Sequence, residues 1–248
     1  MQITNFKSVF IFLIPTIFFT FFHISIAESQ PTEVLPVILI HGYRQDESSW
    51  NAWEELLSKD GIPYYPASFE DDFCGSAAEH ARELVQLVEF IKQEEQSDKV
   101  NIVGFSKGGL DARVYLQDDN ENVANLIMIG TPNDGAPLAQ WDILCDPASE
   151  DLEPGSLATK AERNPNTNYY TISANYVGPW WISNGFWGFW TKVMNGNPYI
   201  PGPDDGLVPV GSVESKPYFH NIGHPSDYHL DLQTENEYRL TRSILGKN

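Results

Sequence analysis

One serine in this sequence stands where a nucleophile could be built. Residues 100–116 read VNIVGFSKGGLDARVYL, and they place Ser106 between Gly104 and Gly108 in a G-x-S-x-G pattern. The residues before it are typical of a strand and those after it of a helix, which is the context this pattern needs. Flanking glycines remove side chains that would collide at a sharp strand-to-helix turn, where the backbone is strained. The pattern indicates a nucleophile, although a small residue in a tight structural turn would look the same.

A reactive serine also needs donors for the oxyanion that forms on a substrate. The amide of Lys107 would open the helix after the turn, and a helix N-terminus favours negative charge. The run PVILIHG at 36–42 predicts a buried strand that ends in His41 and Gly42, so the amide of Tyr43 could be the second donor. An ordinary glycine at a strand end is the alternative interpretation. We expect His41 to order this loop rather than to act as a base.

A reactive serine is activated by a histidine base that a carboxylate orients. For a serine at such a strand-to-helix turn, the acid follows the serine in the chain and the base follows the acid. Among many acidic candidates, the turn DDGLVP at 204–209 is distinguished because it lies after the irregular part of the chain and before the last predicted strand. It offers Asp205 and its neighbour Asp204. Adjacent carboxylates also serve as turn and capping residues, so this second interpretation stays open.

Three histidines near the C-terminus are candidates for the base. His220 falls inside the strand predicted at 217–223, where we expect a structural role. His224 follows the end of that strand. His229 lies five residues before Thr234, which caps the last predicted helix, and a catalytic histidine belongs on this loop. The spacing favours His229, and His224 remains the alternative.

Alternating strands and helices predict the framework that must position these residues. The helices are predicted at 51–61, 76–93, 108–117 and 234–245, and the strands at 36–42, 62–69, 100–104, 122–132, 166–174 and 217–223. Ser76 with Glu79 and Thr234 with Glu237 have the spacing of capping boxes at two helix starts. Short connections between alternating elements predict an α/β fold, a mostly parallel sheet covered by helices on both faces.

This regularity fails between about residues 133 and 200, where an aromatic block reads GPWWISNGFWGFW. Its large side chains are Trp180, Trp181, Phe186, Trp187, Phe189 and Trp190. An apolar lid or acyl-binding wall is one interpretation, and a small core of its own is the other. We expect one α/β domain over 28–248, with lid or cap insertions within about 137–200.

The first 27 residues have the character of a targeting segment. Lys7 precedes the apolar run SVFIFLIPTIFF, and SIA at the end of the segment is a small-residue cleavage pattern, as in secretory signals. An uncleaved membrane anchor is the alternative, because the apolar stretch is long for a signal. Ser25 and Ala27 favour cleavage. We therefore expect a secreted or periplasmic protein with no integral membrane segment after cleavage.

The charge of the chain excludes one class of partner. The chain carries 15 basic and 34 acidic residues, a net charge of −19. Because Lys7 is the only charged residue in the first 27, removing them leaves 14 basic and 34 acidic residues, a net charge of −20. So acidic a protein repels phosphate backbones and anionic membranes, and nucleic acid is not an expected partner.

The two cysteines, Cys74 and Cys145, could form one disulfide in an exported protein. The sequence does not show whether their geometry permits the bond, so both states stay open. They lack the spacing and neighbours of a metal site.

Five blocks of this sequence occur in the order seen in secreted bacterial triacylglycerol lipases, which the chain resembles from about residue 36 to residue 232. They are HGY at 41–43, GFSKGGLDARVYL at 104–116, GTPNDGAPLA at 130–139, DDGLVP at 204–209 and HLDL at 229–232. The resemblance implies an α/β-hydrolase fold and hydrolysis of carboxylic esters. It also implies that Asp205, directly before Gly206, is the acid and that His229 is the base.

The sequence departs from these lipases at three positions. Phe105 precedes the serine where His is usual, Lys107 follows it where Met or Gln is common, and Asp134 stands where Arg is common. We expect Phe105 and Lys107 to change the polarity of the pocket rather than the chemistry. The substrate preference is therefore less defined by the resemblance than the reaction type.

The resemblance also raises the question of calcium. In these lipases an Asp two residues after the catalytic His binds calcium, and Asp231 matches it. A second Asp is expected upstream of the acid, but PWWISNGFWG supplies none. One carboxylate is a poor basis for a site of six to eight oxygen ligands, so we predict no obligatory metal and no cofactor.

Together these inferences predict a secreted serine ester hydrolase, a lipase or esterase acting on lipid or fatty-acyl esters through Ser106, Asp205 and His229. A polyester depolymerase or an acyl thioesterase would use the same triad. A non-catalytic lipid- or partner-binding protein of the same fold is the alternative from another class. Such a protein would lack a triad member, whereas this chain has a candidate for each.

Overall fold

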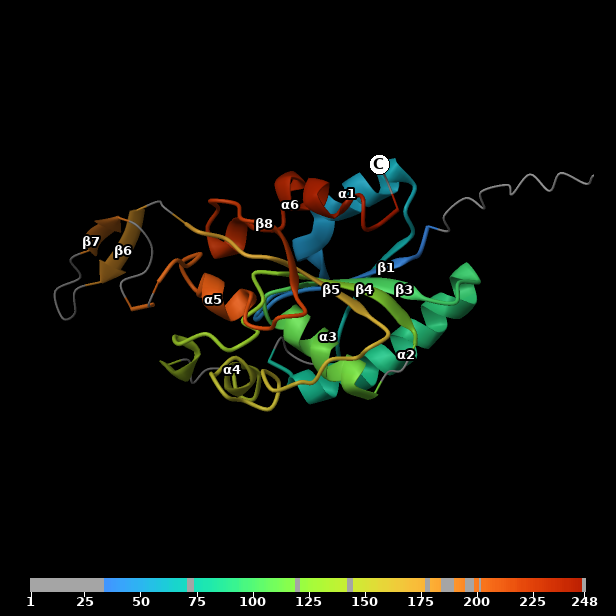
Figure 1. Ribbon diagram of the computed structural model, residues 1–248, viewed down its shortest axis with the longest axis horizontal. Coiled ribbons are helices and arrows are strands. Elements are labelled where there is room, and N and C mark those ends of the chain that lie inside the picture. Colours follow the sequence, from blue (N-terminus) through green and yellow to red (C-terminus); the bar gives the residue numbers. More distant parts are fainter. Residues whose placement is uncertain are drawn as a thin grey trace, which may run out of the picture. The chain divides into compact units, whose positions relative to one another are not determined.

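The central feature of the fold is a six-stranded parallel sheet in the order β2-β1-β3-β4-β5-β8 (Figure 1). The computed structural model describes residues 34–70, 74–118, 121–141, 145–176, 179–183, 190–194, 199–200 and 202–246. The strands are β1 (Val37–Ile40), β2 (Tyr64–Pro66), β3 (Val100–Phe105), β4 (Val123–Ile129), β5 (Asn168–Ile172) and β8 (His220–Gly223). Each coincides with a predicted strand, so the predicted α/β fold class is confirmed.

Helices cover both faces of this sheet. One face carries α1 (Asn51–Asp60) and α6 (Glu235–Thr241), and the other carries α2 (Ala77–Glu95) and α3 (Lys107–Asp118) (Figure 1). Successive side chains of a strand point to opposite faces. Val37 and Leu39 accordingly join the buried cluster that contains Trp53 of α1, whereas Ile38 joins the cluster that contains Leu84 of α2.

Three of the predicted helix boundaries are confirmed, whereas the last helix, predicted to reach residue 245, ends at Thr241. The capping box of α2 is formed by Ser76 and Glu79, and that of α6 by Thr234 and Glu237. Gly61 ends α1 in the left-handed conformation, with a φ of 66°. Capping side chains satisfy amides that a helix leaves without intrahelical partners, which is why these pairs mark the helix starts in the sequence.

Short elements replace the regular alternation between β4 and α5 (Val210–Val213). They are η2 (Ala139–Trp141), α4 (Ala148–Asp151) and an antiparallel pair of strands, β6 (Pro179–Ser183) and β7 (Trp190–Met194). In the aromatic block, Trp180, Trp181 and Trp190 fall in these strands, and Phe186, Trp187 and Phe189 lie outside the described residues. The lid remains a prediction. The signal over residues 1–27 also remains a prediction, because these residues lie outside the described part of the chain.

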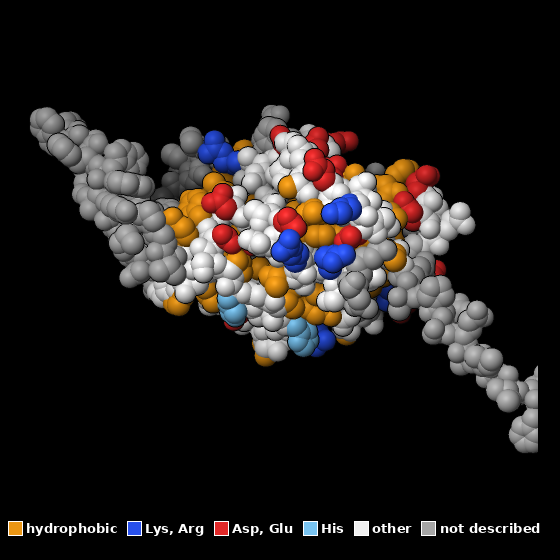
Figure 2. All heavy atoms as spheres, turned by 90° about the horizontal axis from the view of Figure 1, so that it is seen from above, with side chains coloured by type: hydrophobic (Ala, Val, Ile, Leu, Met, Phe, Trp, Pro, Cys, Tyr) orange, Lys and Arg blue, Asp and Glu red, His pale blue; other side chains and the backbone are white. Residues whose placement is uncertain are grey.

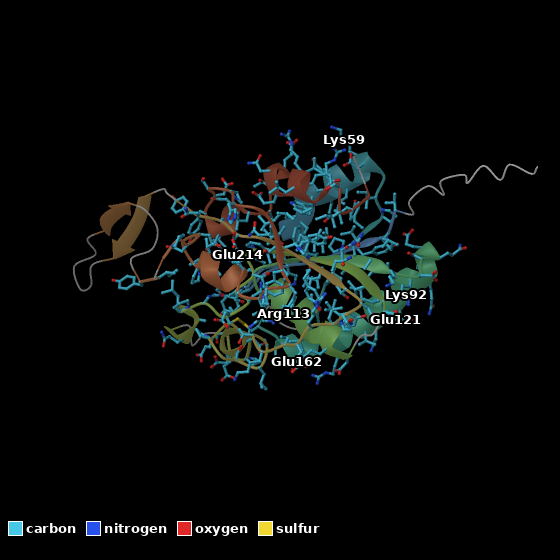
Figure 3. All side chains as sticks on the ribbon, viewed as in Figure 1. Lys59, Lys92, Arg113, Glu121, Glu162 and Glu214 are labelled. Atoms are coloured by element: carbon cyan, nitrogen blue, oxygen red, sulfur yellow. A yellow bond between two sulfur atoms is a disulfide. The ribbon has the colours of Figure 1, made fainter. Side chains whose placement is uncertain are left out.

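Two connections hold part of this irregular stretch against α2 and α3. Cys74, before α2, forms a disulfide with Cys145, before α4, which answers the question that the sequence left open. Arg113 of α3 is buried (Figure 3) and donates hydrogen bonds to Oδ1 of Asn133 at 3.0 Å and to the carbonyl oxygen of Ala161 at 2.7 Å. Part of the cavity wall described below comes from this anchored stretch.

Charged side chains of both signs lie on the face that carries α1 and α6 (Figure 2). Arg242, just after α6, pairs with Asp60 of α1 at 2.8 Å, and Arg239 pairs with Glu235 within α6 at 2.6 Å. The exposed Arg239–Glu235 pair contributes little to stability, typically about 0–1 kcal/mol. Among the described residues, no helix has the length and apolar character needed to cross a membrane.

Candidate active site

Three of the predicted site residues meet at the carboxyl edge of the sheet. Nε2 of His229 lies 2.9 Å from Oγ of Ser106, and Nδ1 of the same ring lies 2.7 Å from Oδ2 of Asp205. All three side chains are buried. A nucleophile, a base and an orienting acid within hydrogen-bond reach of one another are the geometry of a serine triad.

Ser106 occupies a strained turn between β3 and α3. Its φ is 51°, in the left-handed region that residues with a Cβ rarely adopt. A Cβ at Gly104 would lie 2.6 Å from the amide nitrogen of Gly109, and one at Gly108 would lie 2.4 Å from the carbonyl oxygen of Ile40. The two glycines of the G-x-S-x-G pattern are thus required by close backbone contacts on both sides of the serine.

The acid is held by its own turn. Oδ1 of Asp205 accepts hydrogen bonds from the amides of Leu207 at 3.0 Å and Val208 at 2.7 Å, which leaves Oδ2 facing His229. The carbonyl oxygen of Asp205 also accepts a bond from the His229 amide at 2.9 Å. Asp204 faces elsewhere, since its Oδ1 accepts the amide of Gly206 at 2.8 Å.

The two other candidate histidines lie apart from this cluster. Nδ1 of His224 lies 2.9 Å from Oγ of Ser173 and 3.4 Å from Oε1 of Glu214, and its side chain is 58% exposed. Glu214 is labelled in Figure 3. His220 is exposed at the start of β8, near the ring of Tyr170. Neither contacts Ser106 or Asp205 in any hydrogen bond of the described structure.

The candidate oxyanion donors lie on the two segments that flank Ser106. Lys107 is the first residue of α3, and the first amides of a helix have no acceptor within the helix. Tyr43 lies just after the end of β1, and its side chain lines the cavity beside Ser106. Nδ1 of His41 lies 3.0 Å from the carbonyl oxygen of Gly42, a contact that ties His41 to this loop as the sequence predicts. Burial lowers the pKa of His41 below its ordinary value.

An apolar cavity of about 230 Å³ opens beside Ser106 and His229. Its apolar walls come from Tyr43, Phe105, Pro132, Ala136, Leu138, Ala139, Leu152, Leu207, Val208 and Leu230. Ser149 adds a hydroxyl-bearing side chain to the lining. Several of these residues belong to the irregular stretch, where no periodic pattern in the sequence pointed to them. The lining suits a hydrocarbon chain better than a polar group.

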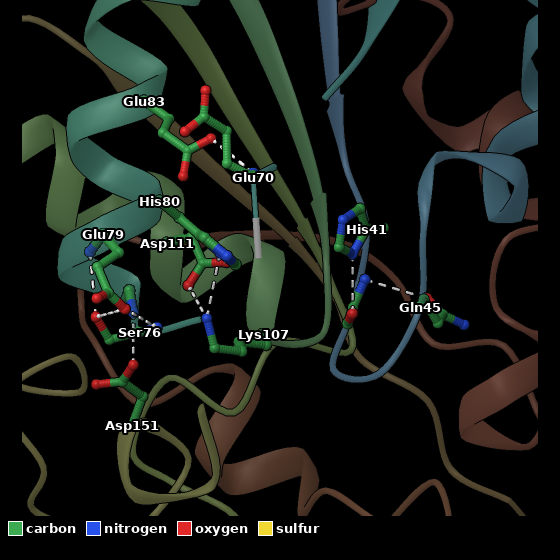
Figure 4. Close-up of polar contacts among 12 residues, drawn as sticks. His41, Gln45, Glu70, Ser76, Glu79, His80, Glu83, Lys107, Asp111 and Asp151 are labelled. Carbon is green, nitrogen blue, oxygen red and sulfur yellow. Dashed lines mark hydrogen bonds and ion pairs between the residues drawn. The ribbon is translucent and has the colours of Figure 1, made fainter. Parts of the chain in front are cut away.

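Lys107 does not line this cavity, so the expectation that it alters the polarity of the pocket is wrong. Its side chain is buried, and its Nζ lies 2.7 Å from Oδ1 of Asp111 (Figure 4). Nδ1 of His80 in α2 lies 2.7 Å from Oδ2 of the same carboxylate. Burial alone would raise the pKa of Asp111, but Lys107 and His80 hold it below its ordinary value. The spacing of Lys107 and Asp111, four residues apart on a helix, was the available signal in the sequence.

The described part of the chain gathers no three His, Cys, Asp or Glu side chains in the way a metal site requires. Asp231, the match to a calcium ligand, is exposed in the short helix η4 (His229–Asp231). The expectation that no metal or cofactor is required remains a prediction.

Comparisons with known proteins agree with this architecture. Residues 36–181 match the family model described as palmitoyl protein thioesterase. A triacylglycerol lipase of Pseudarthrobacter phenanthrenivorans is 29% identical over 119 residues, which are 43% of this chain and 35% of that protein. The match thus spans about a third of the relative's length.

Solved structures give the same fold over most of the chain. The mature form of the Bacillus licheniformis lipase BlEst2 has a TM-score of 0.67 and 21% identity, and the match covers 88% of this chain and 94% of that one. The metagenomic carboxyl esterase MGS0156 has a TM-score of 0.56 and 16% identity, over 80% and 65% of the two chains. At these identities the likeness establishes the α/β-hydrolase fold.

Proposed function

This chain belongs to the palmitoyl protein thioesterase family, and from that premise we propose that it is a secreted serine hydrolase of fatty-acyl esters. The observation that carries the proposal is the chain of hydrogen-bond contacts from Ser106 through His229 to Asp205. The apolar cavity beside Ser106 supports an acyl chain as the group that is bound. The lipase and esterase relatives support ester hydrolysis as the reaction.

In the proposed reaction, Oγ of Ser106 attacks the carbonyl carbon while Nε2 of His229 takes the hydroxyl proton. Nδ1–H of His229 donates to Asp205, which holds the ring in the required tautomer and stabilises its cation. The amides of Tyr43 and Lys107 stabilise the oxyanion, and each such donor is worth about 3 kcal/mol. His229 then protonates the departing alcohol. Water, activated by the same histidine, releases the acid from the acyl-enzyme.

A thioester substrate is the second candidate, and the match to the palmitoyl protein thioesterase model favours it. The triad and the oxyanion donors would act on a thioester in the same way, with a thiol as the leaving group. Hydrolysis of p-nitrophenyl butyrate and p-nitrophenyl palmitate compares two acyl-chain lengths. Hydrolysis of p-nitrophenyl palmitate and palmitoyl-coenzyme A compares an ester with a thioester of the same acyl chain. The ratio of their kcat/KM values assigns the preferred leaving group.

Secretion and a lid form part of the proposal. The first 27 residues have the pattern of a signal, and the disulfide between Cys74 and Cys145 suits an oxidising compartment. We also propose that residues 28–248 form a single domain and that insertions within about 137–200 supply the lid. The aromatic block supports a lid that meets a lipid–water interface.

The deciding experiment compares three alanine variants in hydrolysis of p-nitrophenyl butyrate. Ser106→Ala and His229→Ala should each lower kcat by about 10⁴-fold or more, because nucleophile and base act as one unit. His224→Ala is the matched control, since it removes an imidazole that contacts Ser173 and Glu214 instead of Ser106. It should keep kcat within about threefold of wild type, as an exposed side chain outside the triad. Undiminished activity of Ser106→Ala would refute the mechanism and favour a non-catalytic binding protein.

A further inference from the structure

The two candidate oxyanion donors lie on segments that are packed directly against each other. A Cβ at Gly108, in the first turn of α3, would lie 2.4 Å from the carbonyl oxygen of Ile40 and 2.5 Å from that of His41. The end of β1 and the start of α3 are therefore in backbone contact. The directions of the Tyr43 and Lys107 amides depend on how these two segments are held.

Each donor amide shares a peptide plane with the carbonyl group of the preceding residue, so a contact to that carbonyl oxygen orients the plane. A trans peptide points its C=O and its N–H in opposite directions, so a bond to the carbonyl also aims the amide. The contact at 3.0 Å between Nδ1 of His41 and the Gly42 carbonyl oxygen thus orients the amide of Tyr43. The Ser106 carbonyl oxygen accepts the amide of Gly109 at 3.1 Å, which in turn orients the amide of Lys107.

A series of side-chain contacts joins Lys107 to His41. Figure 4 shows its polar part, in which Lys107 and His80 contact Asp111. Nζ of Lys107 and Nδ1 of His80 bind the two oxygens of Asp111, each at 2.7 Å. The ring of His80 stacks on Phe69, with centroids 3.8 Å apart and planes 5° apart. Phe69 in turn meets the ring of His41 edge-on, at 5.5 Å and 68°.

The charges in this set are balanced locally. Lys107, Asp111 and His80 are each at most 3% exposed. Burial of an ion costs several kcal/mol unless the ion is paired and hydrogen-bonded. Each of these three groups therefore depends on the contacts that the other two provide. Stacking on Phe69 fixes the plane of the His80 ring. The side chain of residue 107 cannot move without breaking this arrangement.

We propose that His41, Phe69, His80, Lys107 and Asp111 form a positioning cluster that aims the two oxyanion amides at the substrate. Among the described residues, none of these side chains has a hydrogen bond to Ser106, Asp205 or His229, so they act through the backbone of Tyr43 and Lys107. The inference rests on the proposed function. It adds a role for five residues outside the triad and explains why a lysine is accommodated next to the nucleophile.

The test uses two variants of the full chain that leave every oxyanion amide in place. Asp111→Asn removes the charge that holds Lys107, and His80→Phe keeps the stack on Phe69 but removes the Nδ1 contact to Asp111. With p-nitrophenyl butyrate, each should lower kcat about tenfold with KM unchanged, which is part of the 10²–10³-fold loss caused by deleting a whole oxyanion donor. The inhibition constant of phenylboronic acid, whose tetrahedral adduct places an oxygen in the oxyanion hole, should rise by the same factor.

Tyr238→Phe is the control for a loss of stability alone. It removes the hydrogen bond from the Tyr238 hydroxyl to Asp60 at 2.8 Å, and neither residue belongs to the positioning cluster. It should lower the unfolding temperature but leave kcat and the boronate constant unchanged. Wild-type kcat and boronate binding in folded Asp111→Asn and His80→Phe would overturn the positioning role. If Asp111→Asn does not fold, the same readouts on His80→Phe decide. Activity that survives Ser106→Ala would instead refute the proposed function.

Discussion

At the scale of single residues, Glu237 carries a carboxylate in a place that disfavours charge. It is 0% exposed, and its Oε2 accepts bonds from the amide of Thr234 at 3.1 Å and from its hydroxyl at 2.6 Å. Its Oε1 has no hydrogen-bond partner among the described residues. Burial raises the pKa of Glu237 above its ordinary value of 4.5, although the bonds from Thr234 act in the opposite direction. The folded protein therefore binds this proton more tightly than the unfolded chain does.

We predict that Glu237→Gln stabilises the protein at neutral and alkaline pH but not in acid. A raised pKa contributes stability that is complete below the unfolded value and is lost as the pH rises through the folded value. Glutamine can still cap the helix and never ionises, so its advantage should be absent at about pH 4 and present at about pH 8. Urea denaturation at both pH values measures it.

The control for this prediction is Glu235→Gln in the same first turn of α6. Glu235 is exposed and pairs with Arg239, so its replacement should have little effect on the free energy of unfolding at either pH. A stability difference for Glu237→Gln that does not change with pH would contradict the prediction.

At the scale of elements, the nucleophile depends on how closely β3 and α3 approach each other. A Cβ at Gly104 would lie 2.6 Å from the amide nitrogen of Gly109 and 2.7 Å from the carbonyl oxygen of Gly108. These are backbone atoms of a helix start and cannot rotate away as a side chain would. Even one methyl group would push α3 away from β3 and with it the turn that carries Ser106.

We therefore predict that Gly104→Ala lowers the free energy of unfolding by about 1–3 kcal/mol, the usual range for overpacking, and lowers kcat as well. Gly211→Ala is the matched control, because a Cβ in α5 meets open space. It should be neutral or gain about 0.4–1 kcal/mol by restricting the unfolded chain. Chemical denaturation of both variants measures the effect, and equal stabilities would argue against a tight approach at the turn.

Most elements could be predicted from the sequence because their signals are local. Ser76 with Glu79 and Thr234 with Glu237 mark helix starts through contacts made within one helical turn. The order of the serine, acid and base candidates narrowed the choice of acid and base, and the resemblance to lipases selected Asp205 and His229 from them. The structure brings Ser106 and His229 within 2.9 Å of each other, although 123 residues separate them.

What could not be predicted depends on contacts between distant parts of the chain. Lys107 was expected to be a pocket residue because it follows Ser106 where the lipases have Met or Gln, but its partner His80 lies on another helix. Whether the cysteines pair depended on the path of the chain between them. The wall residues Ser149 and Leu152 lie in a stretch without periodicity, so no pattern assigned them a face.

At the scale of the whole molecule, the disulfide connects the α/β core to the cavity wall. Cys74 and Cys145 are separated by 71 residues, and their bond joins the start of α2 to the start of α4. Two hydrogen bonds reinforce this junction: the Ala148 amide donates to the Cys74 carbonyl oxygen at 3.2 Å, and the Ala77 amide donates to Asp151 at 2.5 Å. Ser149 and Leu152, which line the cavity, lie at this anchored end.

We predict that the double variant Cys74→Ser/Cys145→Ser is less stable by about 2–4 kcal/mol, because a cross-link that closes a long loop restricts the unfolded chain. The loss should appear as a lower urea midpoint. Since the same bond holds a cavity wall, KM for p-nitrophenyl palmitate should rise more than KM for p-nitrophenyl butyrate. Dithiothreitol should shift the wild type toward the variant and leave the variant itself unchanged. An unchanged midpoint with both substrates bound as in the wild type would mean that the two hydrogen bonds and the surrounding packing hold the wall without the disulfide.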